Sequence, residues 1–137
     1  MATMRKDLHH HIKPLRSLSA TAISSNTTTA GQIIDTKNFG ALEFLIQSSS
    51  RTDGTYAPIL HEGDDPSLSD ATVVDASNLL GTIADATISA ANTIKKIGYL
   101  VGVKRYVRLS LVSTLVTTGA TLSAIAVQAN PDLFPAA

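Results

Sequence analysis

Short runs in which apolar and polar side chains alternate recur along the chain, and turn-forming residues separate them. In residues 41–48, for example, Leu42, Phe44 and Ile46 fall on one side, and residues 105–113 alternate in the same way. A period of two residues is that of a half-buried β-strand, because successive side chains of a strand point to opposite faces of its sheet. The pattern therefore predicts a chain that folds mainly into strands.

About seven to eight short strands are expected from this pattern. They fall at residues 15–23, 32–36, 41–48, 55–61, 94–101, 105–113 and 121–129, with a further short strand near residues 79–83. Pro58 cannot donate a backbone hydrogen bond, which indicates an edge or bulged strand, whereas the run 121–129 is apolar on both faces and suits a central strand. These features predict an all-β fold, a single antiparallel β-sandwich or barrel.

The length of 137 residues suits one domain with an extension at each end. Residues 1–14 lack periodicity and end in Pro14, so they are expected to form an extended N-terminal arm. The β-domain is then expected to occupy residues 15–130, and residues 131–137 a proline-rich C-terminal tail.

Three connections also have expected structures. Residues 24–31 are expected to form a loop, and Asp53-Gly54 indicates a hairpin turn. Residues 62–93 are expected to form a long, mostly irregular connection. A short helix over residues 69–81 is the alternative, which β-branched residues disfavour.

The formal net charge is zero, with 11 basic and 11 acidic side chains, but the charges are unevenly placed. Residues 1–16 and 94–137 are basic, and residues 51–93 are acidic. These blocks either neutralise each other within one fold or meet on different copies or partners. The zero net charge argues against a nucleic-acid partner. The chain has neither a long apolar run nor a secretory signal, so no membrane association is expected.

No group of residues indicates catalysis or a bound cofactor. The chain has no cysteine, which excludes a thiolate nucleophile and cysteine-ligated metals. His9, His10 and His11 could bind a metal, but adjacent residues on an extended arm do not converge easily on one ion, so a solvated or partner-contacting arm is preferred. His61 beside Glu62 is not a catalytic dyad, and the acidic loop that follows does not fit a calcium-binding loop. We therefore expect a protein that is not an enzyme and has no cofactor or metal.

Several motifs occur in a characteristic order along the chain. They are IIDTKNFGALEFLIQ (residues 33–47), EGDDPSLSDA (62–71), LLGT (79–82) followed by IGYLVGVKRYVRL (97–109), and AVQANP (126–131). In these motifs the chain resembles a family of small virion proteins of tailed bacteriophages, over about residues 12–131.

The resemblance implies a structural protein of the virion head. In particular it implies a capsid decoration, or cement, protein that binds the lattice of the major capsid protein on the capsid surface, after assembly in the host cytoplasm. Copies of the chain itself, as a dimer or trimer, are a second expected partner. A head–tail connector, neck or tail component is the alternative. A carbohydrate- or ligand-binding β-sandwich is a further one, although such sites use exposed aromatic residues and the chain has only three Tyr, three Phe and no Trp.

Partner contacts are expected from the arm, from the basic strand and from the apolar residues of the tail. These residues are Arg5, Lys6, His9, His10, Lys13, Arg16, Lys104, Arg105, Arg108, Leu133 and Phe134.

Overall fold

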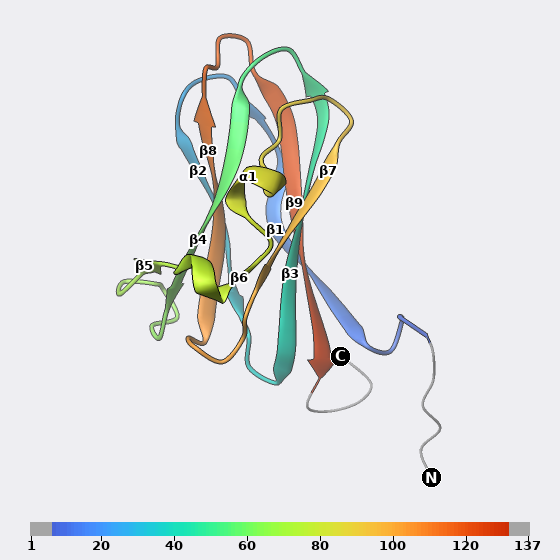
Figure 1. Ribbon diagram of the computed structural model, residues 1–137, viewed down its shortest axis with the longest axis vertical. Coiled ribbons are helices and arrows are strands. Elements are labelled where there is room, and N and C mark those ends of the chain that lie inside the picture. Colours follow the sequence, from blue (N-terminus) through green and yellow to red (C-terminus); the bar gives the residue numbers. More distant parts are fainter. Residues whose placement is uncertain (1–6, 132–137) are drawn as a thin grey trace.

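A computed structural model describes residues 7–131 as two antiparallel sheets packed face to face (Figure 1). The strands are β1 (Ile12–Ile23), β2 (Thr28–Asp35), β3 (Phe39–Arg51), β4 (Thr55–Gly63), β5 (Thr72–Val73), β6 (Leu79–Leu80), β7 (Ile94–Tyr99), β8 (Tyr106–Thr114) and β9 (Ala120–Pro131). A 3₁₀ turn (Ala76–Asn78) and the short helix α1 (Ile83–Ala86) interrupt the connection between the sheets. The predicted all-β sandwich is confirmed.

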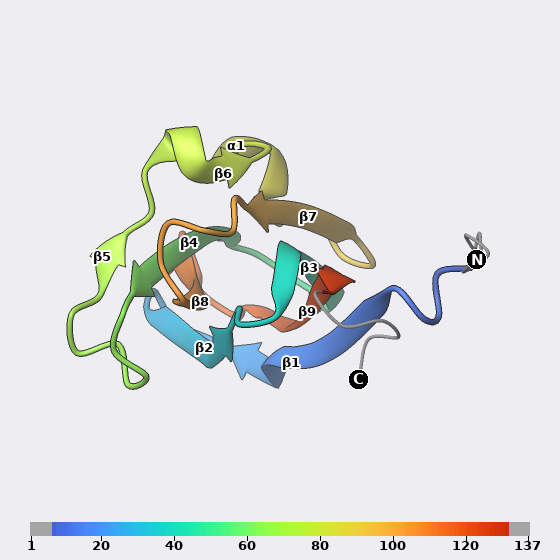
Figure 2. The same ribbon diagram turned by 90° about the horizontal axis from the view of Figure 1, so that it is seen from below.

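One sheet has five strands in the order β1-β9-β3-β7-β6, and the other has four in the order β2-β8-β4-β5. Seen from below, β1 lies beside β2 along one side of the sandwich, and α1 and β6 lie on the opposite side (Figure 2). The nearly apolar strand β9 lies between β1 and β3, in the central position that its sequence predicts.

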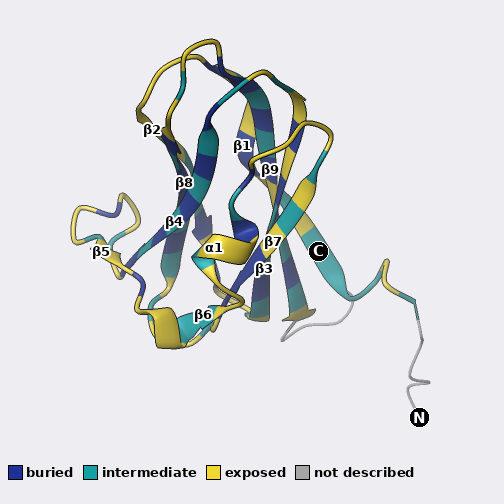
Figure 3. Ribbon diagram, turned by 45° about the horizontal axis from the view of Figure 1, so that its top comes forward, coloured by how far each residue is buried: buried dark blue, intermediate teal, exposed yellow. Residues whose placement is uncertain are grey.

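The core forms where the inward faces of the two sheets meet. Phe44 and Ile46 of β3 face Leu109 and Leu111 of β8, and all four side chains are fully buried. Figure 3 shows buried residues alternating with more exposed ones along these strands, as the sequence pattern predicts. Each fully buried side chain of this size contributes about 1.5–3 kcal/mol to folding.

The ends of the domain differ from the prediction. Strand β1 begins at Ile12, before the expected boundary at residue 15, and Pro14 pairs with Val127 of β9. Because β1 is an edge strand, it tolerates a proline that cannot donate a hydrogen bond. Residues 12–14 therefore belong to the sheet and not to the arm. At the other end β9 continues to Pro131.

The expected loop at residues 24–31 is also shorter than predicted. Strand β2 begins at Thr28 and pairs with β8, and its register shifts between Ala30 and Ile33. A Cβ atom added to Gly31 would lie 2.5 Å from the Ser17 carbonyl oxygen and 2.6 Å from that of Leu109. Gly31 is therefore a strand residue that lets neighbouring backbones approach closely, rather than a loop residue.

The connection 62–93 is mostly irregular, as predicted. The expected short strand is β6, at Leu79–Leu80, and the alternative helix over residues 69–81 does not form. Strand β4 pairs with β8 along its length, but on its other side only His61 and Glu62 pair with β5. In the sheet order β4 lies between β8 and β5, so the prediction of an edge or bulged strand is wrong. The proline is tolerated because it lies between the isolated bridge of Tyr56 with Ile88 and the short pairing with β5.

The Asp53-Gly54 turn reverses the chain but does not form a hairpin. Gly54 has a φ of +90°, as the turn requires. The two strands that it joins, β3 and β4, lie in different sheets, so the turn crosses from one sheet to the other. The predicted hairpin is wrong for this reason.

Candidate functional site

A buried polar pair joins the two sheets near one end of the sandwich. The Tyr99 hydroxyl of β7 donates a 2.6 Å hydrogen bond to Glu62 Oε1 of β4, and the Lys104 amide donates to the Tyr99 oxygen at 3.1 Å. Tyr99 is fully buried and Glu62 is 7% exposed. Burial, followed by the hydrogen bond to Glu62, raises the pKa of Tyr99. Both polar groups are satisfied within the chain, so the pair supports the fold.

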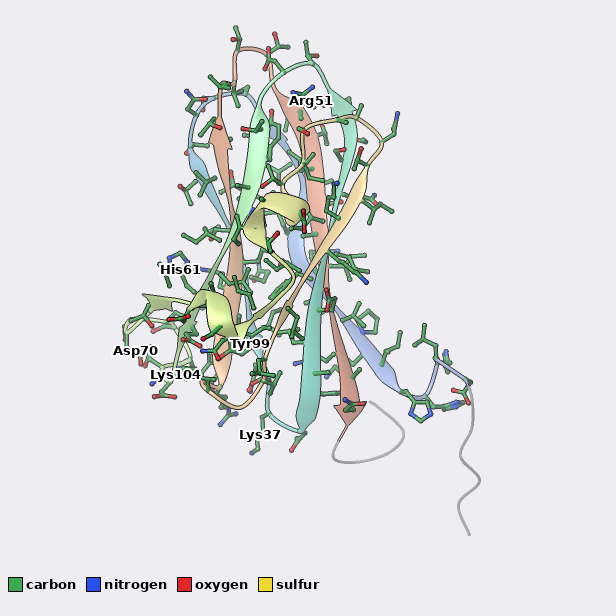
Figure 4. All side chains as sticks on the ribbon, in the orientation of Figure 1. Lys37, Arg51, His61, Asp70, Tyr99 and Lys104 are labelled. Carbon is green, nitrogen blue, oxygen red and sulfur yellow. The ribbon has the colours of Figure 1, made fainter. Side chains whose placement is uncertain are left out.

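Two of the predicted basic residues also have partners within the chain. Lys104 Nζ lies 2.9 Å from Asp64 Oδ2, and Figure 4 shows Lys104 and Tyr99 beside the loop that carries Asp70. The Arg105 guanidinium binds Asp35 through two bonds, of 2.8 and 2.9 Å. The basic block 94–137 and the acidic block 51–93 thus meet within one copy at the Lys104–Asp64 pair, which is one of the two arrangements that their charges allow.

The motifs behind the phage resemblance contact one another. Asp35 of the first motif binds Arg105 of the fourth, and its carbonyl oxygen accepts a 2.8 Å bond from Gln128 Nε2 of the last. Leu79 of the LLGT motif pairs with Tyr99. These motif residues therefore maintain one end of the fold.

Arg108 is the third predicted residue of the basic strand, and it lies outside these ion pairs. It lies on β8 directly opposite His61 of β4, and both residues are half-buried. Arg108 Nε and His61 Nδ1 are buried and have no hydrogen-bond partner among residues 7–131. Within the same residues Arg108 forms no ion pair.

The predicted arm residues divide between described and undescribed parts of the chain. Arg5, Lys6, Leu133 and Phe134 lie outside the described residues. His9 and His10 lie before β1, and the two rings meet edge to face with centroids 5.0 Å apart.

His10 is held by Asp7. The His10 amide donates a 2.9 Å bond to Asp7 Oδ1, and this bond lowers the pKa of Asp7. Lys13 and Arg16 follow on β1, at the edge of the five-stranded sheet. Arg108 lies on the other sheet, so the structure does not gather the predicted basic residues into one surface.

The sequence prediction missed an apolar patch on the outer face of the five-stranded sheet. Leu45 of β3 lies opposite Ile125 of β9, which is 47% exposed, and Ile94 at the start of β7 is 67% exposed. Val127 continues the patch along β9 and is half-buried. The sequence does contain one sign of this patch. Leu45 is an apolar residue on the side of its strand that also carries the polar residues Glu43 and Gln47. We call Leu45, Ile94, Ile125 and Val127 the outer apolar patch.

The acidic loop after β4 is held by its own carboxylates. Asp65 accepts hydrogen bonds from the Ser67 hydroxyl and from the amides of Ser67 and Ser69, and these bonds lower its pKa to about 2. Asp70 accepts the amides of Asp64 and Asp65. Across residues 7–131, no group of three or more His, Asp and Glu side chains is arranged to hold a metal ion. No helix in the same part of the chain is long and apolar enough to cross a membrane.

The geometry defines the chain as a two-sheet antiparallel β-sandwich. No protein-family model matches it, and no curated protein matches it significantly. Among solved structures, it is similar to the SPBc2 prophage-derived protein YomS, with a TM-score of 0.49 and 17% identity over 85% of this chain and 92% of that one.

Two further solved structures are similar to the chain. A structure of the infectious bursal disease virus Gx strain gives a TM-score of 0.44 and 12% identity, over 90% of this chain and 35% of that one. The structure of PirA gives a TM-score of 0.34 and 11% identity, over 94% of this chain and 100% of that one. All three TM-scores lie below 0.5, so the function proposed below rests on the motifs and surfaces of the chain itself.

Proposed function

We propose that this chain is a non-enzymatic structural protein of a tailed-phage virion, and that it decorates the head by binding the lattice of the major capsid protein. The motif resemblance over about residues 12–131 supports the class of protein. The contacts among the motifs support it further. Glu62, Tyr99 and Asp35 come from separate motifs, and each bonds to a residue of another motif.

The outer apolar patch is the observation that carries the decoration role. Its members come from three adjacent strands, so they share one broad sheet face. Charged side chains border it, because Arg16 of β1 lies opposite Ile125 and Lys96 of β7 lies opposite Leu45. An exposed apolar area with a charged rim is typical of a protein-binding surface. On a lattice, many copies of a modest contact add up to a large stabilisation of the shell.

The described aromatic residues give no support to the carbohydrate-binding alternative. Phe44, Tyr56 and Tyr99 are buried in the core, and Phe39 and Tyr106 are partly buried. Saccharide sites in β-sandwiches need aromatic faces open to solvent. We retain the neck or tail role as the rival, since it would use the same kind of surface.

Co-sedimentation with capsids that lack the protein tests the proposal. The wild-type chain should bind saturably, and Ile125→Asp should abolish binding, because it places a charge in the outer apolar patch. Leu115→Asp is the matched control, since Leu115 is 78% exposed but lies in the loop between β8 and β9. Wild-type protein that stays in the supernatant, or equal binding by both variants, would contradict the proposal.

A further inference from the structure

An apolar groove of about 360 Å³ opens beside β4, at a gap in the pairing of the four-stranded sheet. At one end of the gap the amide and carbonyl of Tyr56 bond to Ile88, and at the other the Leu60 carbonyl accepts the Val74 amide. All residues that line the groove are apolar, and they include Ile59, Leu60, Val73, Leu79, Ile83 and Val112.

The gap also leaves one backbone acceptor on the groove side of β4. Backbone groups alternate in direction along a strand, and Tyr56 and Leu60 both bond on the side away from β8. The Pro58 carbonyl, midway between them, therefore points to the same side. No amide of residues 7–131 bonds to it there, and Pro58 lines the groove. An extended segment could thus donate an amide to β4 while its side chains fill the groove.

The C-terminal segment, residues 132–137, has the side chains that such a groove takes. It reads DLFPAA and lies outside the described residues. Leu133 and Phe134 are large and apolar, and the sequence favours extended backbone at Phe134 because a proline follows it. A groove of this volume lies near the lower end of the range of ligand pockets, about 300–1,000 Å³, so it suits one or two side chains and not a whole domain.

The sheet register places the groove beyond the reach of Leu133 and Phe134 of the same chain. Pro131 pairs with Phe39, whereas Leu79 of the groove wall lies three strands away and three residues further along β3. This spacing separates Pro131 from Leu79 by about 17 Å, at about 3.3 Å per residue and 4.8 Å per strand. Leu133 and Phe134 can extend only about 7 and 11 Å beyond Pro131. Figures 1 and 2 both show β5, on the far wall of the groove, further still from the end of β9.

We propose that the C-terminal segment of a second copy of this chain binds in the groove, with Leu133 and Phe134 against its apolar walls. The contact joins neighbouring copies of the protein. None of the residues that line the groove belongs to the outer apolar patch, so this contact and the proposed capsid contact use different surfaces. On a lattice of copies, contacts between neighbours add to those with the shell.

An NMR titration of the full-length Phe134→Asp variant with a peptide of residues 131–137 tests the groove. The variant is used because its own segment no longer competes well for an apolar site. We expect the peptide to shift the groove methyl signals saturably, namely those of Val73, Ile83 and Val112. A control peptide with Leu133→Ser and Phe134→Ser should leave them unchanged. No shift in the groove with the native peptide, or equal shifts with both peptides, would overturn the site.

A pair of matched substitutions checks where the peptide binds. Val73→Asp, made in the same variant, should weaken peptide binding at least about tenfold, because it places a charge on the groove wall. Val103→Asp is the control, since Val103 is 47% exposed, against 60% for Val73, and lies between β7 and β8 outside the groove. Equal binding by the two proteins would overturn the assignment to the groove.

Mixing two full-length variants tests the choice of a second copy. Isotope-labelled Phe134→Asp protein keeps an intact groove, and unlabelled Val73→Asp protein keeps an intact C-terminal segment. We expect the unlabelled protein to shift the groove signals of the labelled one, and an unlabelled protein with both substitutions to leave them unchanged. No shift in the first mixture, or wild-type groove signals that keep their bound positions on dilution, would overturn the contact between copies. None of these outcomes bears on capsid binding.

Discussion

The Tyr99 hydroxyl and the Glu62 carboxylate, 2.6 Å apart, join β7 of one sheet to β4 of the other. The bond is buried, and it connects two of the motifs that the chain shares with phage virion proteins. A charge-assisted bond of this kind in a core fixes how the sheets are placed relative to each other, because both groups would be costly to bury apart.

Tyr99→Phe should therefore destabilise the fold. The change leaves the Glu62 carboxylate buried without its main donor, which should lower the free energy of unfolding by about 1–3 kcal/mol. Urea unfolding followed by circular dichroism measures it. Tyr106→Phe is the control, since Tyr106 is only partly buried, and it should change stability little. In a double-mutant cycle with Glu62→Gln the two changes should be non-additive, and simple additivity would rule out the coupling.

Gly119→Ala should cost more than Gly102→Ala, although both glycines have a positive φ, of +106° and +122°. A Cβ atom at residue 119 would lie 1.9 Å from the Ile23 carbonyl oxygen, whereas one at residue 102 would have nothing within 4 Å. We expect Gly102→Ala to cost about 1–2 kcal/mol from backbone strain alone. Gly119→Ala should exceed about 3 kcal/mol because the backbone must move. Equal melting temperatures of the two variants would contradict this.

The turn at Asp53 shows what local sequence can and cannot predict. Asp53-Gly54 correctly marks a chain reversal, and alternation correctly marks the strands on either side. The pairing of β3 and β4 was wrong, because each strand packs its apolar face inward from a different sheet. Asp53 instead accepts the amides of Thr117, Thr118 and Gly119, and so holds together two distant loops. Contacts of that range have no signature in a local pattern.

Acid should weaken the loop that Asp65 organises. Its hydrogen bonds lower the pKa of Asp65 from its ordinary value of 3.8 to about 2. The folded chain therefore releases this proton more readily than the unfolded chain does. The resulting stabilisation is full above about pH 4 and is lost as the pH falls through about 2. Asp65→Asn should remove part of the decline in stability between these values. Unfolding curves at several pH values measure it, and an unchanged slope in the variant would refute the assignment.

The candidate surfaces were only partly predictable. The sequence correctly predicts that Arg108 lies on a strand. That it has no ion pair within residues 7–131 follows from the folded arrangement, in which Asp35 binds Arg105 and Asp64 binds Lys104. His61 is not near Arg108 in sequence, and register alone makes them neighbours. The outer apolar patch could not be predicted for the same reason. Leu45, Ile94 and Ile125 come from three separate parts of the chain, and they share one face only after β3, β7 and β9 have paired.

Substitutions in the outer apolar patch should separate binding from stability. Leu45→Lys changes a half-buried residue on the outer face, so the free energy of unfolding should change by less than about 1 kcal/mol. Binding to undecorated capsids should nevertheless fall sharply, because a charge then faces an apolar contact. Thermal unfolding and co-sedimentation on the same preparations measure the two effects. A variant that loses stability and binding together would give no support to a docking role for Leu45.

The most direct test of the central proposal is a cryo-electron microscopy reconstruction of the phage or prophage particle that encodes this chain. We expect density for the β-sandwich at repeated positions on the outside of the capsid, with the outer face of the five-stranded sheet against the major capsid protein. Density for the sandwich at the neck or tail, or a particle that contains no copy of the chain, would contradict it.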